Sequence, residues 1–238
     1  MNINPTPESL KNALRAVESE IAESALKANR QPEEIRLVAV SKYVEYPVCK
    51  QLIQQGAREL GESRPQLLAS KAKAALSDGL NVKWHQIGHL QTNKVRDILP
   101  YTTLIHSVDS VRLLDSLEEN LEKYYPDKPF QEILLEVNYE QEDNKTGLNP
   151  DAIIGVLEYA LTLPRIRVTG LMSMSALGST PAEARRTFAA VRELRNDLQA
   201  RFLPDADLPH LSMGMSHDFH EAILEGATLV RVGSRLFE

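Results

Sequence analysis

The sequence predicts an α/β protein built as a single (β/α)8 TIM barrel. Eight short runs rich in branched apolar residues alternate with segments whose apolar residues recur at helical spacing, and such alternation is typical of parallel strands joined by helices. The length of 238 residues is close to the roughly 250 residues typical of this barrel. No linker rich in Pro, Gly or Ser interrupts the chain, so residues 1–238 are expected to form one domain.

The first expected element is a helix that precedes strand one. Thr6 can cap it, Pro7 suits its first turn, and apolar residues recur at helical spacing from Leu10 to Ala25. The strands are expected at residues 35–40, 57–60, 82–87, 103–107, 133–138, 167–172, 208–212 and 228–232. Helical patterns lie between them at residues 47–55, 66–77, 92–99, 110–124, 150–161, 181–202 and 217–225. No helix is expected after the last strand, and the first helix is expected to fill that gap in the outer ring.

Composition and charge exclude several classes of function. The formal net charge of −6 and the pI near 5.6 are unlike those of a dedicated nucleic-acid-binding protein. No apolar run approaches the length of a membrane span, and the N-terminus has no signal-peptide pattern. Cys49 is the only cysteine, so neither an intrachain disulfide nor a cysteine-based zinc site can form. These features predict a cytoplasmic protein without a nucleic-acid or membrane partner.

The first candidate for chemistry is Lys42, which follows the first strand directly after Ser41. Functional groups of such a barrel lie at the carboxyl ends of its strands. A lysine amine held at the barrel mouth loses water, which favours the neutral form that can attack a carbonyl group. The alternative is a lysine whose stem packs on the barrel while its amine reaches solvent.

Polar segments also follow the second to fifth strands. Residues 61–64 (Gly-Glu-Ser-Arg) can form a turn in which Ser63 caps the next helix. Residues 85–94 place histidine, amide and lysine side chains near one strand end, and His106 can point into the barrel. Residues 138–149 form a long polar segment, which is either a functional loop or a solvated one.

The ends of the seventh and eighth strands predict a phosphate site. Residues 211–216 (Leu-Ser-Met-Gly-Met-Ser) and 230–235 (Val-Arg-Val-Gly-Ser-Arg) offer small residues and hydroxyls, and these two loops often bind phosphate in such barrels. A helix starting near His217 would add the positive end of its dipole. Arg231 lies within an apolar strand, so it is expected either to pair with a carboxylate or to face a bound ligand.

Two other kinds of site are not expected. His217, His220 and Glu221 could lie on one helical face, but their order matches no zinc motif and no third strong ligand is evident. No metal site is therefore predicted. Serine-histidine-aspartate catalysis is also not expected, because the chain lacks a Gly-x-Ser-x-Gly turn.

These motifs resemble those of the pyridoxal phosphate homeostasis proteins, which have the alanine racemase N-terminal barrel fold. The resemblance runs nearly the whole length of the chain. It is carried by residues 37–42, 61–62, 85–94, 170–172, 211–216 with Asp218, and 230–234. Because these motifs are long and occur in the same order, chance similarity is a poor explanation.

The resemblance implies a cofactor, pyridoxal 5'-phosphate (PLP), and assigns residues to it. Lys42 would form the Schiff base with the aldehyde, and Ser212, Gly233 and Ser234 would hold the phosphate. By analogy with the racemase, Arg231 would face the pyridine nitrogen. The full set implied to bind the cofactor is Lys42, Asn93, Met172, Ser212, Met213, Ser216, Arg231, Gly233 and Ser234.

The sequence departs from the family pattern at a few positions. Ser63 stands where the family usually has asparagine, and Ser234 stands where threonine is usual. Serine keeps the hydroxyl at 234, whereas the shorter side chain at 63 implies a weaker or water-mediated contact with the cofactor. Glu238 stands near the place of a terminal glycine.

The function implied is PLP binding and intracellular PLP homeostasis without ordinary catalytic turnover. Related racemases use a second, β-rich domain that supplies a catalytic tyrosine, and no such segment follows the barrel here. PLP-dependent apo-enzymes are candidate partners, and a monomer is expected. The main alternative is a single-domain, racemase-like PLP enzyme in which Lys42 is one base and His85, His89 or His106 is the other. A sugar-phosphate aldolase using Lys42 and a partner-binding scaffold are further alternatives.

Overall fold

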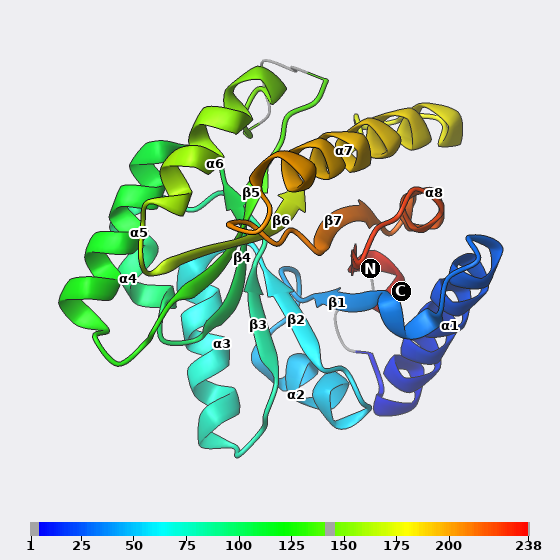
Figure 1. Cartoon of the computed structure of the whole chain (residues 1–238). Coiled ribbons are helices and arrows are strands. Elements are labelled where there is room, and N and C mark those ends of the chain that lie inside the picture. The colour runs from blue at the N-terminus through cyan, green and yellow to red at the C-terminus, as the bar shows by residue number, and fades with distance from the viewer. Residues whose placement is uncertain (1–4, 141–145, 238) are drawn as a thin grey trace.

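Eight parallel strands close into a barrel in which each strand pairs with the next and β1 also pairs with β8 (Figure 1). The computed structural model describes residues 5–140 and 146–237. The strands are β1 (Arg36–Val40), β2 (Glu59–Glu62), β3 (Lys83–Gln86), β4 (Thr102–Val108), β5 (Gln131–Glu136), β6 (Ile166–Met172), β7 (His210–Met215) and β8 (Leu229–Val232). The predicted TIM-barrel fold is confirmed.

Helices surround the barrel (Figure 1). The α-helices are α1 (Pro7–Lys27), α2 (Tyr46–Gln54), α3 (Pro65–Ser77), α4 (Val95–Ile98), α5 (Val111–Tyr124), α6 (Ile153–Leu161), α7 (Pro181–Phe202), α8 (Phe219–Leu224) and α9 (Ser234–Phe237), and the 3-10 helices are η1 (Pro32–Glu34), η2 (Thr92–Lys94) and η3 (Pro150–Ala152). Thr6 caps α1 as predicted, because its hydroxyl accepts a 3.1 Å hydrogen bond from the N–H of Ser9. α1 packs against α8 and α9, so it fills the gap in the outer ring.

Some predicted strand boundaries are wrong. The second strand was expected at residues 57–60 but spans Glu59–Glu62, and the seventh was expected at 208–212 but spans His210–Met215. The ends of these strands are determined by pairing with the neighbouring strands and not by the apolar content of the sequence. Glu59 pairs with Lys83, and His210 pairs with Gly170. A buried carboxylate such as Glu59 can therefore lie within a strand, provided that a cation is close enough to pair with it.

Some predicted helix boundaries are wrong as well. Residues 92–99 divide into η2 and α4, and the helix expected at 217–225 begins only at Phe219. A short helix, α9, follows the last strand, where none was expected. Burial of Leu236 and Phe237, each only 1% exposed, holds that final turn against the rest of the molecule.

The strands separate two apolar layers. The large layer fills the space between the strands and the helices and includes Leu60, Trp84 and Leu211. The small layer lies inside the barrel and consists of Val38, Leu104, Leu134, Met172 and Leu229. Since successive strand residues face opposite sides, the positions two residues along from these also face inward. Three of those positions are polar and buried: His106, Glu136 and Arg231. Glu59, His85 and Ser212 are also buried, and each adjoins a residue of the large layer, so each faces inward as well.

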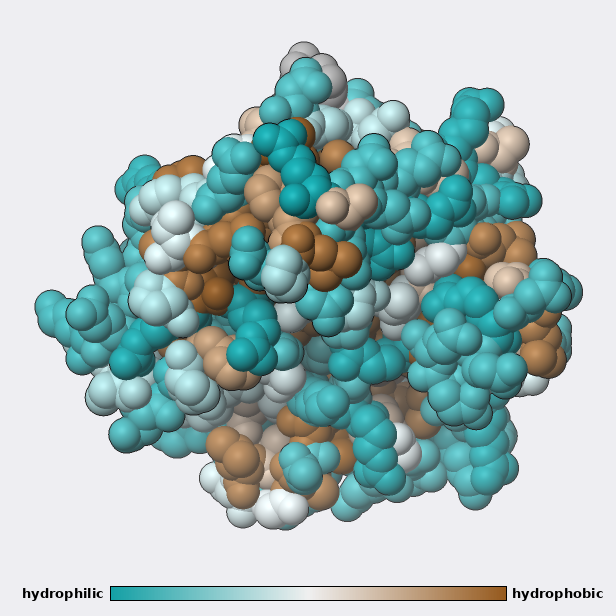
Figure 2. Space-filling model, viewed as in Figure 1, coloured by the Kyte–Doolittle hydropathy of each residue, from teal (hydrophilic) through white to brown (hydrophobic). Residues whose placement is uncertain are grey.

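The face shown in Figure 2 is mostly hydrophilic, with hydrophobic residues in scattered patches. Leu177, in the segment between β6 and α7, is fully exposed, and Met215 at the end of β7 is partly exposed. Within residues 5–140 and 146–237, no helix is both long and apolar enough to span a membrane.

Candidate functional site

Lys42 lies at the carboxyl edge of the strands, where the sequence places it. It follows β1 and Ser41, and its side chain is half-buried. Its Nζ lies 4.9 Å from the centre of the Tyr43 ring, and its backbone carbonyl accepts a 3.3 Å hydrogen bond from Nη2 of Arg64. The amine is therefore at the mouth of the barrel, within reach of solvent and of a ligand.

A buried ion pair holds the segment that precedes Lys42. Nζ of Lys71 donates to a carboxylate oxygen of Glu62 at 2.5 Å and to the backbone carbonyl of Ser41 at 2.9 Å. The side chains of Lys71 and Glu62 are 3% and 0% exposed. Lys71 was not among the residues that the sequence predicted for this site. The signal available was Glu62 itself, because a carboxylate at a buried strand end requires a cation nearby.

The predicted cap at Ser63 is wrong. The N-cap position of α3 belongs to Arg64, which forms no side-chain cap. Instead, Oε1 of Glu62 accepts hydrogen bonds from the backbone N–H groups of Ser63 and Arg64, at 2.8 Å and 3.2 Å. Glu62 thus satisfies the backbone that enters α3 while it also pairs with Lys71.

The loops after β7 and β8 meet, as the sequence predicted. The N–H of Gly233 donates to Oγ of Ser216 at 3.2 Å. A Cβ at Gly233 would lie 3.2 Å from Cβ and 3.3 Å from the carbonyl oxygen of Val40, which is two residues before Lys42. Ser234 is the first residue of α9. The Gly233 backbone and the Ser216 hydroxyl therefore meet beside the strand that leads to Lys42, and Ser234 follows directly in the chain, a set of groups that suits a phosphate.

The helix expected near His217 begins at Phe219, and its contribution to a phosphate site stays a prediction. α8 starts at Phe219 with Asp218 at its N-cap position. The Asp218 carboxylate accepts hydrogen bonds of 2.6 Å from the N–H of Met215 and from the hydroxyl of Ser175. A carboxylate at this helix start offsets the positive end of the dipole, so the helix start is a poor place for an anion.

Arg231 lies inside the barrel beneath the mouth and is 4% exposed. Its Nη1 donates to the carbonyl and the hydroxyl oxygen of Ser212 at 2.8 Å and 2.6 Å, and its Nη2 donates to the carbonyl of Ser173 at 3.1 Å. Burial lowers the pKa of Arg231 to about 10, so the group stays cationic at neutral pH. Among the residues described, no carboxylate lies within ion-pair distance of it.

Glu136 is a second buried charge that the sequence analysis missed. It ends β5, faces inward like Leu134 two residues earlier, and is 3% exposed. One oxygen accepts a 2.9 Å hydrogen bond from the hydroxyl of Thr146, while the other has no partner in the described part of the chain. Burial raises the pKa of this carboxyl. The sequence did carry an indication of this buried carboxylate, because an acidic residue directly follows the apolar residues of a predicted strand.

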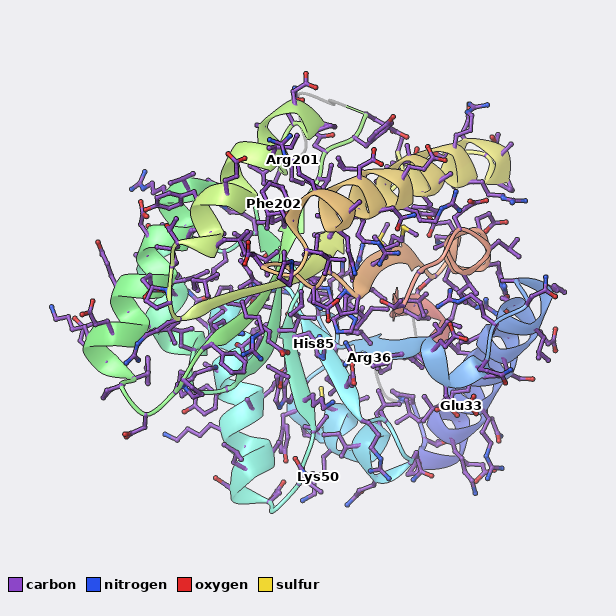
Figure 3. The ribbon with its side chains drawn as sticks, viewed as in Figure 1. Glu33, Arg36, Lys50, His85, Arg201 and Phe202 are labelled. Carbon is purple, nitrogen blue, oxygen red and sulfur yellow. The ribbon has the colours of Figure 1, made fainter. Side chains whose placement is uncertain are left out.

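Of the three histidines considered as bases, two are deep in the barrel. His85 and His106 are both fully buried, and His85 lies near the barrel centre close to Arg36 (Figure 3). Burial lowers the pKa of His85 below the 6.5 of an exposed histidine, and it lowers the pKa of His106 well below that value. His89 is exposed at the mouth, where Nδ1 lies 3.2 Å from a carboxylate oxygen of Asp109.

These burials predict an acid-sensitive fold. The unfolded chain takes up protons on His85 and His106 near pH 6.5, whereas the folded chain does not, so stability falls as the pH drops below about 6.5. Each histidine contributes a slope of up to about 1.4 kcal/mol per pH unit. Urea unfolding measured from about pH 7 to about pH 5 checks this. A free energy of unfolding that stays flat over this range would contradict it.

A matched variant separates the histidines from Glu136. The raised pKa of Glu136 acts in the opposite direction, because the folded chain holds that proton more tightly than the unfolded chain. Glu136→Gln is therefore expected to make the loss of stability on acidification steeper. His210 contributes in the same direction as the buried histidines, since burial lowers its pKa to about 4.

The side chains of the remaining predicted site residues do not all lie at the barrel mouth. Met172 packs inside the barrel, whereas the side chain of Met213 is buried in the layer between strands and helices. Asn93 is exposed on η2. The hydroxyl of Ser212 faces Arg231 in the interior. Part of the polar segment 138–149, residues 141–145, lies outside the described residues. The assignment of these side chains to the cofactor stays a prediction.

His220 on α8 serves as a contact between helices. Nε2 of His220 lies 3.0 Å from a carboxylate oxygen of Glu20, and its Nδ1 lies 2.9 Å from the hydroxyl of Ser24. Both partners are on α1, so His220 links α8 to α1. In the parts of the chain that the structure covers, no three metal-binding side chains come together.

Comparison with known proteins agrees with the barrel fold. The family described as "Alanine racemase, N-terminal domain" matches residues 14–238. The chain is 39% identical over 224 residues to the pyridoxal phosphate homeostasis protein of Aquifex aeolicus (strain VF5), covering 94% of this chain and 95% of that protein.

Solved structures show the same likeness. PipY of Synechococcus elongatus PCC7942, solved with PLP bound, aligns with a TM-score of 0.79 at 34% identity, covering 92% of this chain and 100% of PipY. Alanine racemase of Clostridium difficile 630 aligns with a TM-score of 0.70 at 13% identity, covering 96% of this chain and 56% of the racemase, which shows the shared barrel fold. The chain belongs to the pyridoxal phosphate homeostasis protein family, within the alanine racemase N-terminal fold.

Proposed function

We propose that this protein binds PLP at the barrel mouth, as a Schiff base on Lys42, and serves PLP homeostasis without ordinary catalytic turnover. The observation that carries the proposal is the gathering of Lys42, Ser216 and Gly233 at one edge, above a buried guanidinium with no carboxylate at ion-pair distance among the described residues. The PLP in the PipY structure and the names of the relatives support it.

The residues at the mouth suit the parts of PLP. Nζ of Lys42 is the group that would attack the aldehyde carbon, with loss of water as the C=N bond forms. The hydroxyls of Ser216 and Ser234 offer donors for the phosphate, and the N–H of Gly233 would donate to it in place of Oγ of Ser216. Ser212 is proposed to support this site, although its hydroxyl already accepts from Arg231.

Arg231 supports a role in binding rather than turnover. PLP, when bound, supplies an aldehyde and a ring that can withdraw electrons from a substrate. An arginine donates hydrogen bonds but cannot readily give up a proton. Arg231 placed against the ring nitrogen would therefore leave that nitrogen unprotonated and the ring a poor electron sink.

The alternative is a racemase-like enzyme, and the mouth offers it few bases. His85 and His106 are buried and hydrogen-bonded to each other, and His89 is paired with Asp109 at the surface. Exchange of the Cα hydrogen of amino acids with deuterated water distinguishes the two functions. Exchange that is rapid and that Lys42→Ala abolishes would support the enzyme and contradict the binding role.

The first experiment is the visible spectrum of the purified protein with added PLP, before and after borohydride. Wild type is expected to show a yellow imine band that borohydride fixes covalently, and Lys42→Ala is expected to lose both. Lys94→Ala, a lysine on η2, is the matched control and is expected to keep the band. A wild-type protein that stays colourless would overturn the proposal.

Partners, oligomeric state and location are part of the same proposal. A cavity of about 470 Å³ opens at the strand ends beside the mouth, lined by Met174, Leu177, Pro181 and Met215 among others. Exposed apolar side chains at this edge suit transient contact with PLP-dependent apo-enzymes. A cytoplasmic location fits a single cysteine that is buried and unpaired. The protein is also proposed to be a monomer.

A further inference from the structure

A chain of buried polar side chains crosses the barrel interior beneath the proposed cofactor site. It consists of inward-facing residues of five strands: Glu59 (β2), His85 (β3), His106 (β4), Ser212 (β7) and Arg231 (β8). We name it the interior chain. Nδ1 of His85 lies 2.9 Å from Nε2 of His106, and Nδ1 of His106 lies 2.8 Å from Oγ of Ser212. Nη1 of Arg231 donates to the same Oγ at 2.6 Å.

The other end of the interior chain is anchored at the amino ends of the strands. Nε2 of His85 lies 3.3 Å from Oε2 of Glu59, close but poorly aligned for a hydrogen bond. Oε1 of Glu59 lies 3.5 Å from Nη1 of Arg36 and 3.6 Å from Nζ of Lys83. His85 and Arg36 lie near each other in Figure 3. The carboxylate is thus held in place by two cations.

The two ends of the interior chain determine which group donates the proton in each of its hydrogen bonds. A guanidinium can only donate, and a carboxylate can only accept. Ser212 accepts from Arg231, so its own O–H is available for Nδ1 of His106. A neutral His106 that accepts at Nδ1 carries its proton on Nε2 and donates to Nδ1 of His85. His85 in turn carries its proton on Nε2, which faces Glu59.

The opposite direction fails at both ends. With the proton of His106 on Nδ1, the hydroxyl of Ser212 would accept twice and its own proton would have no acceptor among the contacts described. The lone pair on Nε2 of His85 would then face the Glu59 carboxylate at 3.3 Å, which is repulsive. Buried polar groups left in that state cost free energy.

We propose that the interior chain has one fixed donor direction, from Arg231 to Glu59, and that His106 and His85 are positioning residues that set Arg231 beneath the cofactor. The inference rests on the proposed function. Both contacts of the Ser212 hydroxyl are with the interior chain, so His106 holds the hydroxyl that Nη1 of Arg231 binds. The carbonyls of Ser212 and Ser173 hold the same guanidinium from the backbone, and His106 supplies the side-chain part of its orientation. His106 would therefore affect the cofactor ring through Ser212 and Arg231, without contacting the ring.

The first test determines directly which nitrogen of each histidine ring is protonated, and it needs no cofactor. Two-bond nitrogen–proton correlation NMR on the full-length protein reports which ring nitrogen of each histidine carries hydrogen. We expect His85 and His106 both as neutral rings with hydrogen on Nε2. Hydrogen on Nδ1 of either ring, or a doubly protonated ring at neutral pH, would overturn the fixed direction.

The second test reads the effect on the cofactor. His106→Leu removes both contacts, and PLP is expected to bind about tenfold more weakly, with a shifted absorption maximum. In His106→Gln the amide can accept from Ser212 and donate to His85, so affinity within about threefold of wild type and the original maximum are expected. His210→Gln is the control, because His210 faces inward on β7 but makes no hydrogen bond to the interior chain in the described structure.

The outcomes separate this inference from the proposed function. Wild-type affinity and an unchanged absorption maximum in His106→Leu would overturn the positioning role. If the Leu variant does not fold, His106→Asn takes its place, because the shorter amide cannot reach both Ser212 and His85. Wild-type affinity and an unchanged absorption maximum in His106→Asn would then overturn the role. If wild type binds no PLP at all, the proposed function fails, and the NMR result still decides the donor direction.

Discussion

Lys71→Met is expected to lower the free energy of unfolding by about 3–5 kcal/mol, because it leaves the Glu62 carboxylate buried without its cation. Both side chains are almost fully buried, and Lys71 is the cation within 2.5 Å of Glu62. The variant also removes the donor to the Ser41 carbonyl, one residue before Lys42. PLP binding is therefore expected to weaken together with stability. Urea unfolding and a PLP titration measure the two effects.

A second substitution and a surface pair test the cause. Glu62→Gln combined with Lys71→Met removes the unpaired charge, so the double variant is expected to be more stable than Lys71→Met alone. Arg201→Met breaks an exposed pair with Glu158 at 3.4 Å, and a change of about 0.5 kcal/mol or less is expected. Equal losses in Lys71→Met and Arg201→Met would show that burial of Glu62 is not the cause.

Gly170→Ala is expected to destabilise the barrel by about 3 kcal/mol or more, through overpacking and backbone strain. Gly170 lies in β6 with φ of 153°. A Cβ there would lie 1.9 Å from the carbonyl oxygen of His210 on the adjacent strand β7. Backbone atoms cannot rotate away as a side chain can, so the two strands must separate. Thermal and urea unfolding measure the loss.

The control for this position is Gly155→Ala. Gly155 lies in α6 and is exposed, and apart from its chain neighbours and the backbone of its own helix no atom lies within 4 Å of the place a Cβ would take. Alanine is favoured over glycine in a helix by about 1 kcal/mol, so this variant is expected to be slightly more stable than wild type. If Gly170→Ala proved as stable as Gly155→Ala, the close approach of β6 and β7 would not limit the barrel.

The sequence alone determined the fold class, because alternation of strand and helix patterns is a local property of the chain. It also placed Lys42 at a strand end and paired the loops around Ser216 and Gly233, since parallel strands bring their carboxyl ends to one edge. Arg231 was recognisable as a charge within an apolar strand, and the absence of a carboxylate at ion-pair distance among the described residues favours the ligand-facing alternative.

Only the tertiary structure decided how the buried charges are satisfied. Lys71 lies nine residues after Glu62 on the next helix, and neither spacing nor composition shows that it also binds the Ser41 carbonyl. The interior chain from Glu59 to Arg231 joins five strands, so its hydrogen bonds exist only after the barrel closes. Local patterns fix which residues face inward, whereas closure fixes which of those residues meet.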